Sequence, residues 1–250
     1  MNLSVNLNKV CLLRNSRGSV NPSPEVAART VVDGGAKGLT LHWREDNRHT
    51  RKEDVYLFSR LAKELGVEFN LEGDAREELL ALAREIKPTQ FTLVPVTPGE
   101  VTSDHGWRLP EDRDLIKRSL EPLKAAGVRT AIFVDPEADS MEHATGVCVD
   151  RVEIYTEPYA AAFGTDKQEV ELKRFAACAK RATELGLGVN AGHDLNLANM
   201  PLVAQRVPEL LEVSIGHALL ADALYIGLRE ATARYVRVVA GETVDVPVTC

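Results

Sequence analysis

The stretch GLTLHWREDNRHT, residues 38–50, places two imidazoles and two guanidinium groups within eight positions, where a predicted strand ends. These side chains are His42, Arg44, Arg48 and His49. Imidazole titrates near neutral pH and is the most common side chain for proton transfer. Guanidinium groups donate paired hydrogen bonds to phosphate oxygens. The stretch therefore predicts acid/base chemistry on a phosphorylated substrate.

Two further segments place a Gly-His pair between a predicted strand and the segment that follows it. They are NAGHDL, which contains His193, and SIGHALL, which contains His217. Backbone N–H groups and the positive end of a helix dipole favour a bound anion at such turns. Either pair alone is equally typical of a tight turn, but together they favour phosphate binding. Arg14 and Arg17 add to the local supply of positive charge.

The elements that must position these residues follow a repeating pattern. Short apolar or β-branched runs predict eight strands, at residues 3–7, 38–43, 67–73, 91–96, 130–135, 151–157, 188–193 and 212–217. Helix-period segments lie between most of them, at residues 24–35, 53–66, 76–86, 114–127 and 170–186. Strand and helix alternating eight times predict an α/β protein with a (β/α)8 barrel. The alternative, an open doubly wound sheet, lacks its G-x-G-x-x-G signature after the first strand.

The pattern predicts one barrel domain over residues 1–240, followed by a loosely held tail over residues 241–250. Two long connections, residues 7–24 and 97–112, are rich in turn-forming residues. Loops of this length in a compact domain are usually functional or mobile. Both are therefore candidate lids.

Composition excludes several classes of protein. The chain is 44% hydrophobic and 27% charged, with a net charge of −7, which argues against nucleic acid as the main partner. It has no basic and apolar leader and no run of about 18 apolar residues, so we expect a cytoplasmic protein without a membrane partner. Cys11, Cys148, Cys178 and Cys250 lack C-x-x-C spacing, which predicts neither a zinc knuckle nor a disulfide framework.

In a (β/α)8 barrel the chemistry lies at the carboxyl ends of the strands. The polar residues at or just after the predicted strand ends are Asn6, Asn8, Lys9, His42, Arg44, Glu72, Thr102, Glu153, Asn190, His193 and His217. Burying so many ionisable groups at the mouth of an apolar barrel costs several kcal/mol unless they are paired or serve a ligand. One such residue is more often a loop residue or a cap, but the combination predicts an active site.

A divalent metal could in principle be held by His42, Glu72, His193 and His217. The sequence has no H-x-H or Asp-rich metal spacing, and the neighbouring Arg and Lys side chains would repel a cation. We therefore predict no metal.

Several segments, in this order, resemble the pyridoxine 5′-phosphate synthase family. They are VNLNKVCLLRNSRG, TLHWREDNRHT, EFNLEG, LVPVTPGEVTSDHG, NAGHDL and IGHALL. The resemblance covers residues 4 to about 235 and implies a (β/α)8 barrel with additional helices that assembles as a homo-octamer. It implies an enzyme that condenses 1-deoxy-D-xylulose 5-phosphate with 3-amino-2-oxopropyl phosphate. The products would be pyridoxine 5′-phosphate, inorganic phosphate and water, formed without a metal or organic cofactor.

The resemblance also implies roles for individual residues. His42 and Glu72 would accept protons, His193 would donate one, and Glu153 would stabilise charge in the transition state. The amino-ketone phosphate would be held by Asn6, Arg17, Gly216 and His217. The pentulose phosphate would be held by Arg44, His49 and Thr102, with Asn8 and Lys9 in contact with the same substrate.

The chain departs from the family pattern at two places. Many members have Asp-His where this chain has Asn8-Lys9, and Gly where it has Asp194. Asn8 keeps an acceptor and Lys9 keeps a donor, so binding of the pentulose substrate could persist. The resemblance makes Asp194 a substrate-binding position. If the contact there is the backbone N–H, a side chain that points to solvent is harmless, whereas a carboxylate that faces phosphate would repel it.

Two other functions fit the same residues. One is a non-catalytic barrel that binds a phosphorylated sugar, although such a barrel would not need the proton carriers His42, Glu72, Glu153 and His193. The other is a metal-dependent aldolase or epimerase, which chelation would inactivate.

Overall fold

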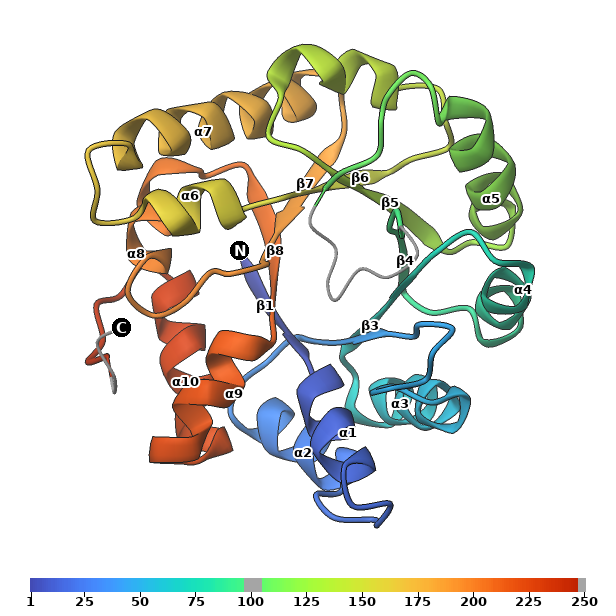
Figure 1. The fold of residues 1–250 in the computed structure, drawn as a ribbon, viewed down its shortest axis with the longest axis vertical. Coiled ribbons are helices and arrows are strands. Elements are labelled where there is room, and N and C mark those ends of the chain that lie inside the picture. The colour runs from blue at the N-terminus through green and yellow to red at the C-terminus, as the bar shows by residue number, and fades with distance from the viewer. Residues whose placement is uncertain (97–104, 247–250) are drawn as a thin grey trace.

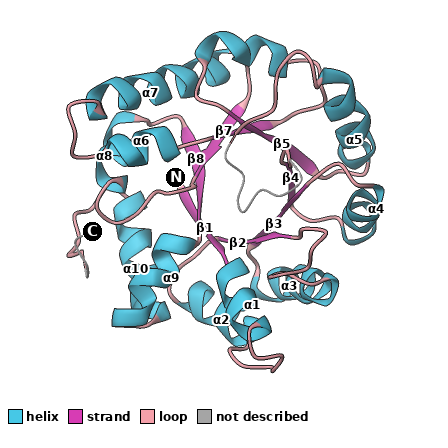
Figure 2. Ribbon diagram, in the orientation of Figure 1, coloured by secondary structure: helices cyan, strands magenta, loops and turns pink. Residues whose placement is uncertain are grey.

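The computed structural model describes residues 1–96 and 105–246, and its centre is a closed barrel of parallel strands (Figures 1 and 2). Each strand pairs with its sequence neighbours, and the first strand pairs with the last. The strands are β1 Asn2–Asn6, β2 Gly38–His42, β3 Glu68–Gly73, β4 Gln90–Leu93, β5 Arg129–Val134, β6 Arg151–Ile154, β7 Gly188–Ala191 and β8 Leu210–Ile215. The (β/α)8 fold is confirmed, and closure between β1 and β8 excludes the open sheet.

The five predicted helices are present and surround the barrel (Figure 2). They are α2 Pro24–Asp33, α3 Lys52–Leu65, α4 Glu77–Ile86, α5 Arg113–Ala125 and α7 Gln168–Glu184. Their ends follow local chemistry: the Ser23 hydroxyl accepts a hydrogen bond from the Val26 amide at the start of α2. Gly66, with φ of 68°, ends α3 in the left-handed conformation.

Further helices extend this pattern. They are α1 Asn8–Asn15, the 3-10 helix η1 Ala138–Ala144, α6 Glu157–Ala162, α8 Met200–Arg206, α9 His217–Ile226 and α10 Leu228–Val239. The prediction of a loop over residues 7–24 was wrong for α1, because that segment buries Val10 and Cys11 and its turn formers begin only at Asn15.

The second predicted lid, residues 97–112, is described only in part. Residues 97–104 lie outside the described part of the chain. After them, the Trp107 amide donates to the Phe133 carbonyl, and its indole donates to the Leu93 carbonyl at 2.8 Å. The end of this connection is therefore fixed to β4 and β5.

The barrel interior is polar, which corrects the expectation of an apolar barrel. The hydroxyls of Ser4 and Thr40 are 2.7 Å apart on adjacent strands. Asn70 Oδ1 accepts from Thr92 Oγ1 at 2.9 Å and from Gln90 Nε2 at 3.2 Å. These hydrogen bonds satisfy polar groups that would otherwise be costly to bury.

Alternation along the strands explains how a polar interior and an apolar core coexist. In β2, Leu39 and Leu41 are fully buried in the hydrophobic core that the helices complete. Thr40 and His42 occupy the alternate positions, which point to the other face of a strand. The same alternation in β3 places Glu72 toward the interior. The apolar side chains of the strands thus pack against the helices, and the polar side chains point into the barrel interior.

The described part of the tail, residues 241–246, lies against the barrel domain. Arg234 Nη1 donates to the Asp245 carbonyl at 2.8 Å, and Val244 and Val246 pack on the core. No helix in residues 1–96 or 105–246 is long and apolar enough to cross a membrane.

Candidate active site

Buried acids and a histidine meet at the carboxyl ends of β2, β3 and β6. His42 and Glu72 are register partners on adjacent strands, and each is only 8% exposed. Burial raises the pKa of Glu72 to about 7, although the nearby charge of His193 acts in the opposite direction. Burial, with Glu72 and Glu212 as neighbours, also raises the pKa of Glu153. These carboxyl groups can therefore hold protons near neutral pH.

His42 is held as a neutral imidazole. Burial, together with the charges of His49, Arg44, Arg76 and His193, lowers its pKa to about 3. Its Nε2 has no hydrogen-bond partner among the residues that the structure describes. A buried neutral nitrogen of this kind is available to a ligand.

The segment after β2 folds back beside His42, as its sequence predicted. Arg44 and His49 are both buried, and the rings of His42 and His49 are 6.4 Å apart. The Thr50 amide donates to His49 Nδ1 at 2.9 Å. Burial, followed by the charge of Arg48, lowers the pKa of His49 to about 4. The segment thus places a guanidinium and a neutral imidazole next to the acid/base groups.

Asn8 ties α1 to this segment. Its Oδ1 accepts hydrogen bonds from the His42 amide at 3.0 Å and from Thr50 Oγ1 at 2.8 Å. Its oxygen is therefore used within the protein. Lys9 is exposed. Its charge lowers the pKa of both His49 and His193, although burial and other groups have larger effects. Lys9 is accordingly the better placed of the two to meet a substrate.

Arg14 is not part of the phosphate-binding supply that the sequence suggested. Its guanidinium donates to both carboxylate oxygens of Asp54, at 2.5 and 2.8 Å, and both side chains are buried. The neighbouring Asn15 donates to the His49 carbonyl at 2.6 Å. The pair is a structural link between α1, the start of α3 and the segment that carries His49. Arg17 lies on the exposed turn after α1.

On the other side of the mouth, β1 meets the turn between β8 and α9. A Cβ at Gly216 would lie 3.1 Å from the Asn6 Cβ and carbonyl oxygen, so a side chain would be crowded there. His217 follows as the exposed first residue of α9. Gly192 is similarly required, because a Cβ there would overlap the Ser214 backbone. The structure therefore brings Asn6, Gly216 and His217 together.

His193 lies in the turn after β7, next to Asp194. Its Nδ1 is 3.2 Å from Asp194 Oδ2, and its ring centroid is 6.0 Å from that of Tyr155. Burial lowers the pKa of His193, but the contact with Asp194 and the charge of Glu72 outweigh burial, so the net pKa is raised. The pKa of His193 is thus raised, whereas that of His42 is lowered.

Most of the predicted site residues therefore converge on one end of the barrel, while Thr102 lies outside the described residues. Sequence reasoning missed Tyr155, whose buried ring packs on His193 and on Phe133. The alternation that turns Glu153 inward also applies to Tyr155, two residues later, and could have identified it. It also missed Arg76, whose guanidinium stacks 4.7 Å from the Trp43 ring centroid. The charge of Arg76 contributes to the lowered pKa of His42.

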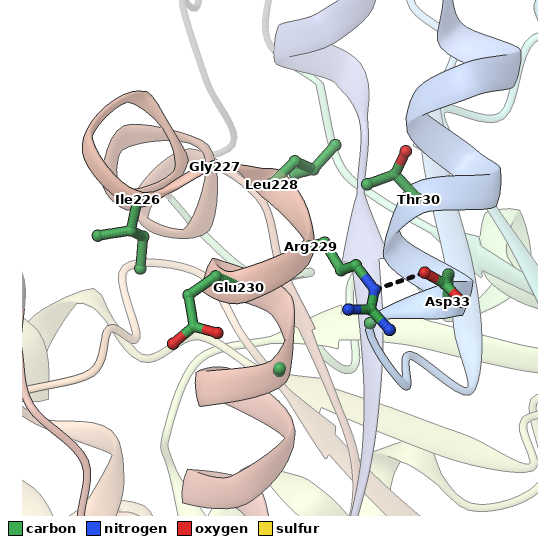
Figure 3. Close-up of a pocket in the computed structure, with 9 residues that line it drawn as sticks. Thr30, Asp33, Ile226, Gly227, Leu228, Arg229 and Glu230 are labelled. Carbon is green, nitrogen blue, oxygen red and sulfur yellow. Dashed lines mark hydrogen bonds and ion pairs between the residues drawn. The ribbon is translucent and has the colours of Figure 1, made fainter.

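A separate pocket of about 470 Å³ lies between the end of α2 and the start of α10 (Figure 3). Asp33 and Arg229 form an ion pair across it. Since α2 leads into β2, this pocket is at the end of the barrel where strands begin, away from the predicted site. Within residues 1–96 and 105–246, no three His, Cys, Asp or Glu side chains are grouped so as to hold a metal ion.

Solved structures of other enzymes share the fold. Tryptophan synthase from M. tuberculosis aligns with a TM-score of 0.65 and 12% identity over 96% of this chain and 92% of its own. Thiamine phosphate pyrophosphorylase from Pyrococcus furiosus aligns with a TM-score of 0.58 and 14% identity, covering 95% and 94% of the two chains. At such low identity these likenesses concern the barrel alone.

Several proteins are much more similar to this chain in sequence. The chain is 46% identical to a protein of Porphyromonas gingivalis named pyridoxine 5′-phosphate synthase, over 93% of this chain and 96% of the relative. A protein of the same name from Xanthomonas oryzae pv. oryzae is 44% identical over 97% and 98%. The profile of the family described as "Pyridoxal phosphate biosynthesis protein PdxJ" matches residues 3–241. The chain therefore belongs to the PdxJ family of pyridoxal phosphate biosynthesis proteins.

Proposed function

We propose that the polar mouth of this barrel condenses 1-deoxy-D-xylulose 5-phosphate with 3-amino-2-oxopropyl phosphate into pyridoxine 5′-phosphate, inorganic phosphate and water. Family membership and the name of the relatives support the overall reaction. The observation that carries the assignment of residues is the pairing of buried His42, whose Nε2 has no partner among the described residues, with buried Glu72 on the adjacent strand. The lowered pKa of His42 and the raised pKa of His193 agree with it. Titratable groups whose environments separate their pKa values supply an acceptor and a donor at one pH.

Proton transfer is the chemistry that this condensation requires most. Imine formation, enolisation, dehydration and aromatisation each move protons between carbon, nitrogen and oxygen. Neutral His42 and Glu72, with its pKa of about 7, would accept protons, and protonated His193 would donate one. Bound phosphates would raise the pKa of His42 toward its ordinary value, because negative charge favours the imidazolium form.

Glu153 would stabilise charge in the transition state. Its raised pKa favours the neutral carboxylic acid, which can donate a hydrogen bond to a developing oxyanion. Its place on β6, in register with Asn190 of β7, puts it beside the strand that leads to His193. Glu72 and Glu153 would therefore have different roles, Glu72 as a proton acceptor and Glu153 as a hydrogen-bond donor.

Two phosphorylated substrates require two anion sites, and the structure supports one on each side of the mouth. Arg44 and His49, with Lys9 nearby, would hold the pentulose phosphate. The Gly216 turn and His217 at the start of α9, beside Asn6, would hold the amino-ketone phosphate. Two sites would also orient the substrates for reaction with each other. The roles of Thr102 and Arg17 stay predictions from the resemblance.

This division predicts that binding of the two substrates can be weakened separately. We expect Arg44→Ala to reduce affinity for 1-deoxy-D-xylulose 5-phosphate about 10-fold or more, as the loss of a charge-assisted contact would. Its effect on 3-amino-2-oxopropyl phosphate should be small, and His217→Ala should have the reverse selectivity. Calorimetric titration of each substrate into each variant measures both. Equal losses for both substrates in both variants would contradict the two-site assignment.

We also propose that the chain forms the homo-octamer that the resemblance implies. Exposed apolar side chains on α1 and α9, which lie side by side in Figure 1, support self-association through this face. Leu13 is 56% exposed, and Leu224 and Tyr225 are 79% and 70% exposed. Exposed apolar side chains on neighbouring helices are consistent with an interface. Light scattering would measure the mass, and a monomer would contradict the proposal. A cytoplasmic location stays a prediction that cell fractionation tests.

A further inference from the structure

We propose that Asp194 is a positioning residue whose carboxylate, within ion-pair distance of the imidazole, keeps His193 protonated, so that His193 can donate its proton over a wider pH range. The inference rests on the proposed function, since it assumes that His193 is the proton donor. The sequence left two possibilities for the Asp194 side chain: it repels phosphate, or it faces solvent and has no role. The inference gives it a third role, in proton donation by His193.

The geometry of the turn supports this role. His193 Nδ1 lies 3.2 Å from Asp194 Oδ2, within ion-pair distance. The backbone on both sides of the contact is fixed: Thr156 Oγ1 donates to the His193 carbonyl, and Asn199 Nδ2 donates to the Asp194 carbonyl at 3.2 Å. The ring of Tyr155 packs against the imidazole. The carboxylate therefore meets an imidazole whose position is already restricted.

The backbone of Asp194 has φ of 64°, in the left-handed region. Non-glycine residues adopt this conformation at a cost, and Asp and Asn tolerate it better than most. Glycine would satisfy the turn without that cost, so the conformation by itself does not explain an aspartate here. Because Asn and Gly both suit the turn, each can replace Asp194 without distorting it, which provides two clean variants.

The charged groups that act on His193, among the described residues, come from several elements. Asp194 and Glu72 favour its protonated form, while burial and Lys9 oppose it, and His193 in turn lowers the pKa of His42. Glu72 has a pKa of about 7, so its charge varies around neutral pH. The contact with His193 lowers the pKa of Asp194, with a smaller contribution from His217. Asp194 is therefore the constant negative charge beside the imidazole.

This arrangement also answers the question that the sequence left open about phosphate. A carboxylate next to His217 would repel a bound phosphate if its charge were not compensated. Here the protonated imidazole of His193 compensates that charge at 3.2 Å. Asp194 can then serve the proton donor with little repulsion of the amino-ketone phosphate.

The test compares the full-length wild type with Asp194→Asn and Asp194→Gly. Imidazole resonances of His193 are titrated by NMR, with the exposed His143 on η1 as an internal reference. We expect the His193 midpoint to move to lower pH in both variants while His143 does not move. The fall of kcat at alkaline pH should move in the same direction, leaving kcat about two- to fivefold below wild type there, as expected for one partly exposed charge pair. Asp166→Asn, at an exposed position, is the matched control.

The outcomes separate the inference from the proposed function. A wild type that forms no pyridoxine 5′-phosphate would overturn the proposed function, whereas the NMR titration would still report on the ion pair. An active wild type with the same His193 midpoint in all three proteins would overturn the inference. A variant that changes only KM, with the pH dependence of kcat unmoved, would also overturn it, since that result assigns Asp194 to substrate binding.

Discussion

Replacing His193 by alanine is expected to lower kcat by about 10²- to 10⁴-fold, the usual contribution of a positioned general acid. Both substrates should still bind with Kd values within a few-fold of wild type, because the proposed anion sites are built from other residues on β1, the segment after β2 and the start of α9. Steady-state kinetics and calorimetry measure the two quantities. The split between turnover and binding also distinguishes an enzyme from a barrel that only binds phosphorylated sugars.

His143→Ala is the matched control, since this histidine is exposed on η1 and takes no part in the proposed site. It should leave kcat as in the wild type. Unchanged turnover in His193→Ala would remove the donor role from His193. In that case the raised pKa of His193 would reflect only its contact with Asp194 and the charge of Glu72.

The second large effect is on stability. Arg14→Ala is expected to lower the free energy of unfolding by about 3–5 kcal/mol, because it leaves the buried carboxylate of Asp54 without its partner. Asp54→Ala should cost a similar amount by leaving the guanidinium unpaired, and it also removes the acceptor for the Arg51 amide at the start of α3. Denaturant unfolding at one fixed chain concentration measures the loss, since self-association would make stability depend on concentration.

Arg29→Ala provides the comparison, because Arg29 forms ion pairs with Glu25 and Glu64 that are largely exposed to solvent. Exposed pairs contribute little, so this variant should unfold close to the wild type. A loss in Arg14→Ala no larger than that in Arg29→Ala would contradict the structural role of the Arg14–Asp54 pair.

All eight strands could be predicted from the sequence because each is a short apolar or β-branched run between turn formers or helical segments. Their inward face could also have been predicted: in Leu39–Thr40–Leu41–His42 the apolar and polar residues alternate, and the polar ones form the barrel interior. Taking the strands as uniformly apolar hid this pattern. The positions of His42, Glu72 and Glu153 at one end then follow from parallel strands in register.

Other features depend on contacts between residues far apart in the chain, which the sequence does not contain locally. From the sequence, Arg14 was predicted to contribute to phosphate binding, but in the fold α1 places it in contact with Asp54. Helix α9, HALLADALYI, is apolar on nearly every side, so it lacks the periodicity that marks an amphipathic helix. The contact between His193 and Asp194 joins sequence neighbours, and it accompanies a left-handed backbone at Asp194 that the sequence does not indicate.

The most direct test of the account is to mix the purified, chelator-treated chain with 1-deoxy-D-xylulose 5-phosphate and 3-amino-2-oxopropyl phosphate. Pyridoxine 5′-phosphate and inorganic phosphate are then followed together over time. Both products are expected to appear in equimolar amounts and at the rate of untreated enzyme. No product from a folded chain would contradict the synthase assignment, and activity lost on chelation and restored by a divalent metal would contradict acid/base catalysis by His42, Glu72 and His193 alone.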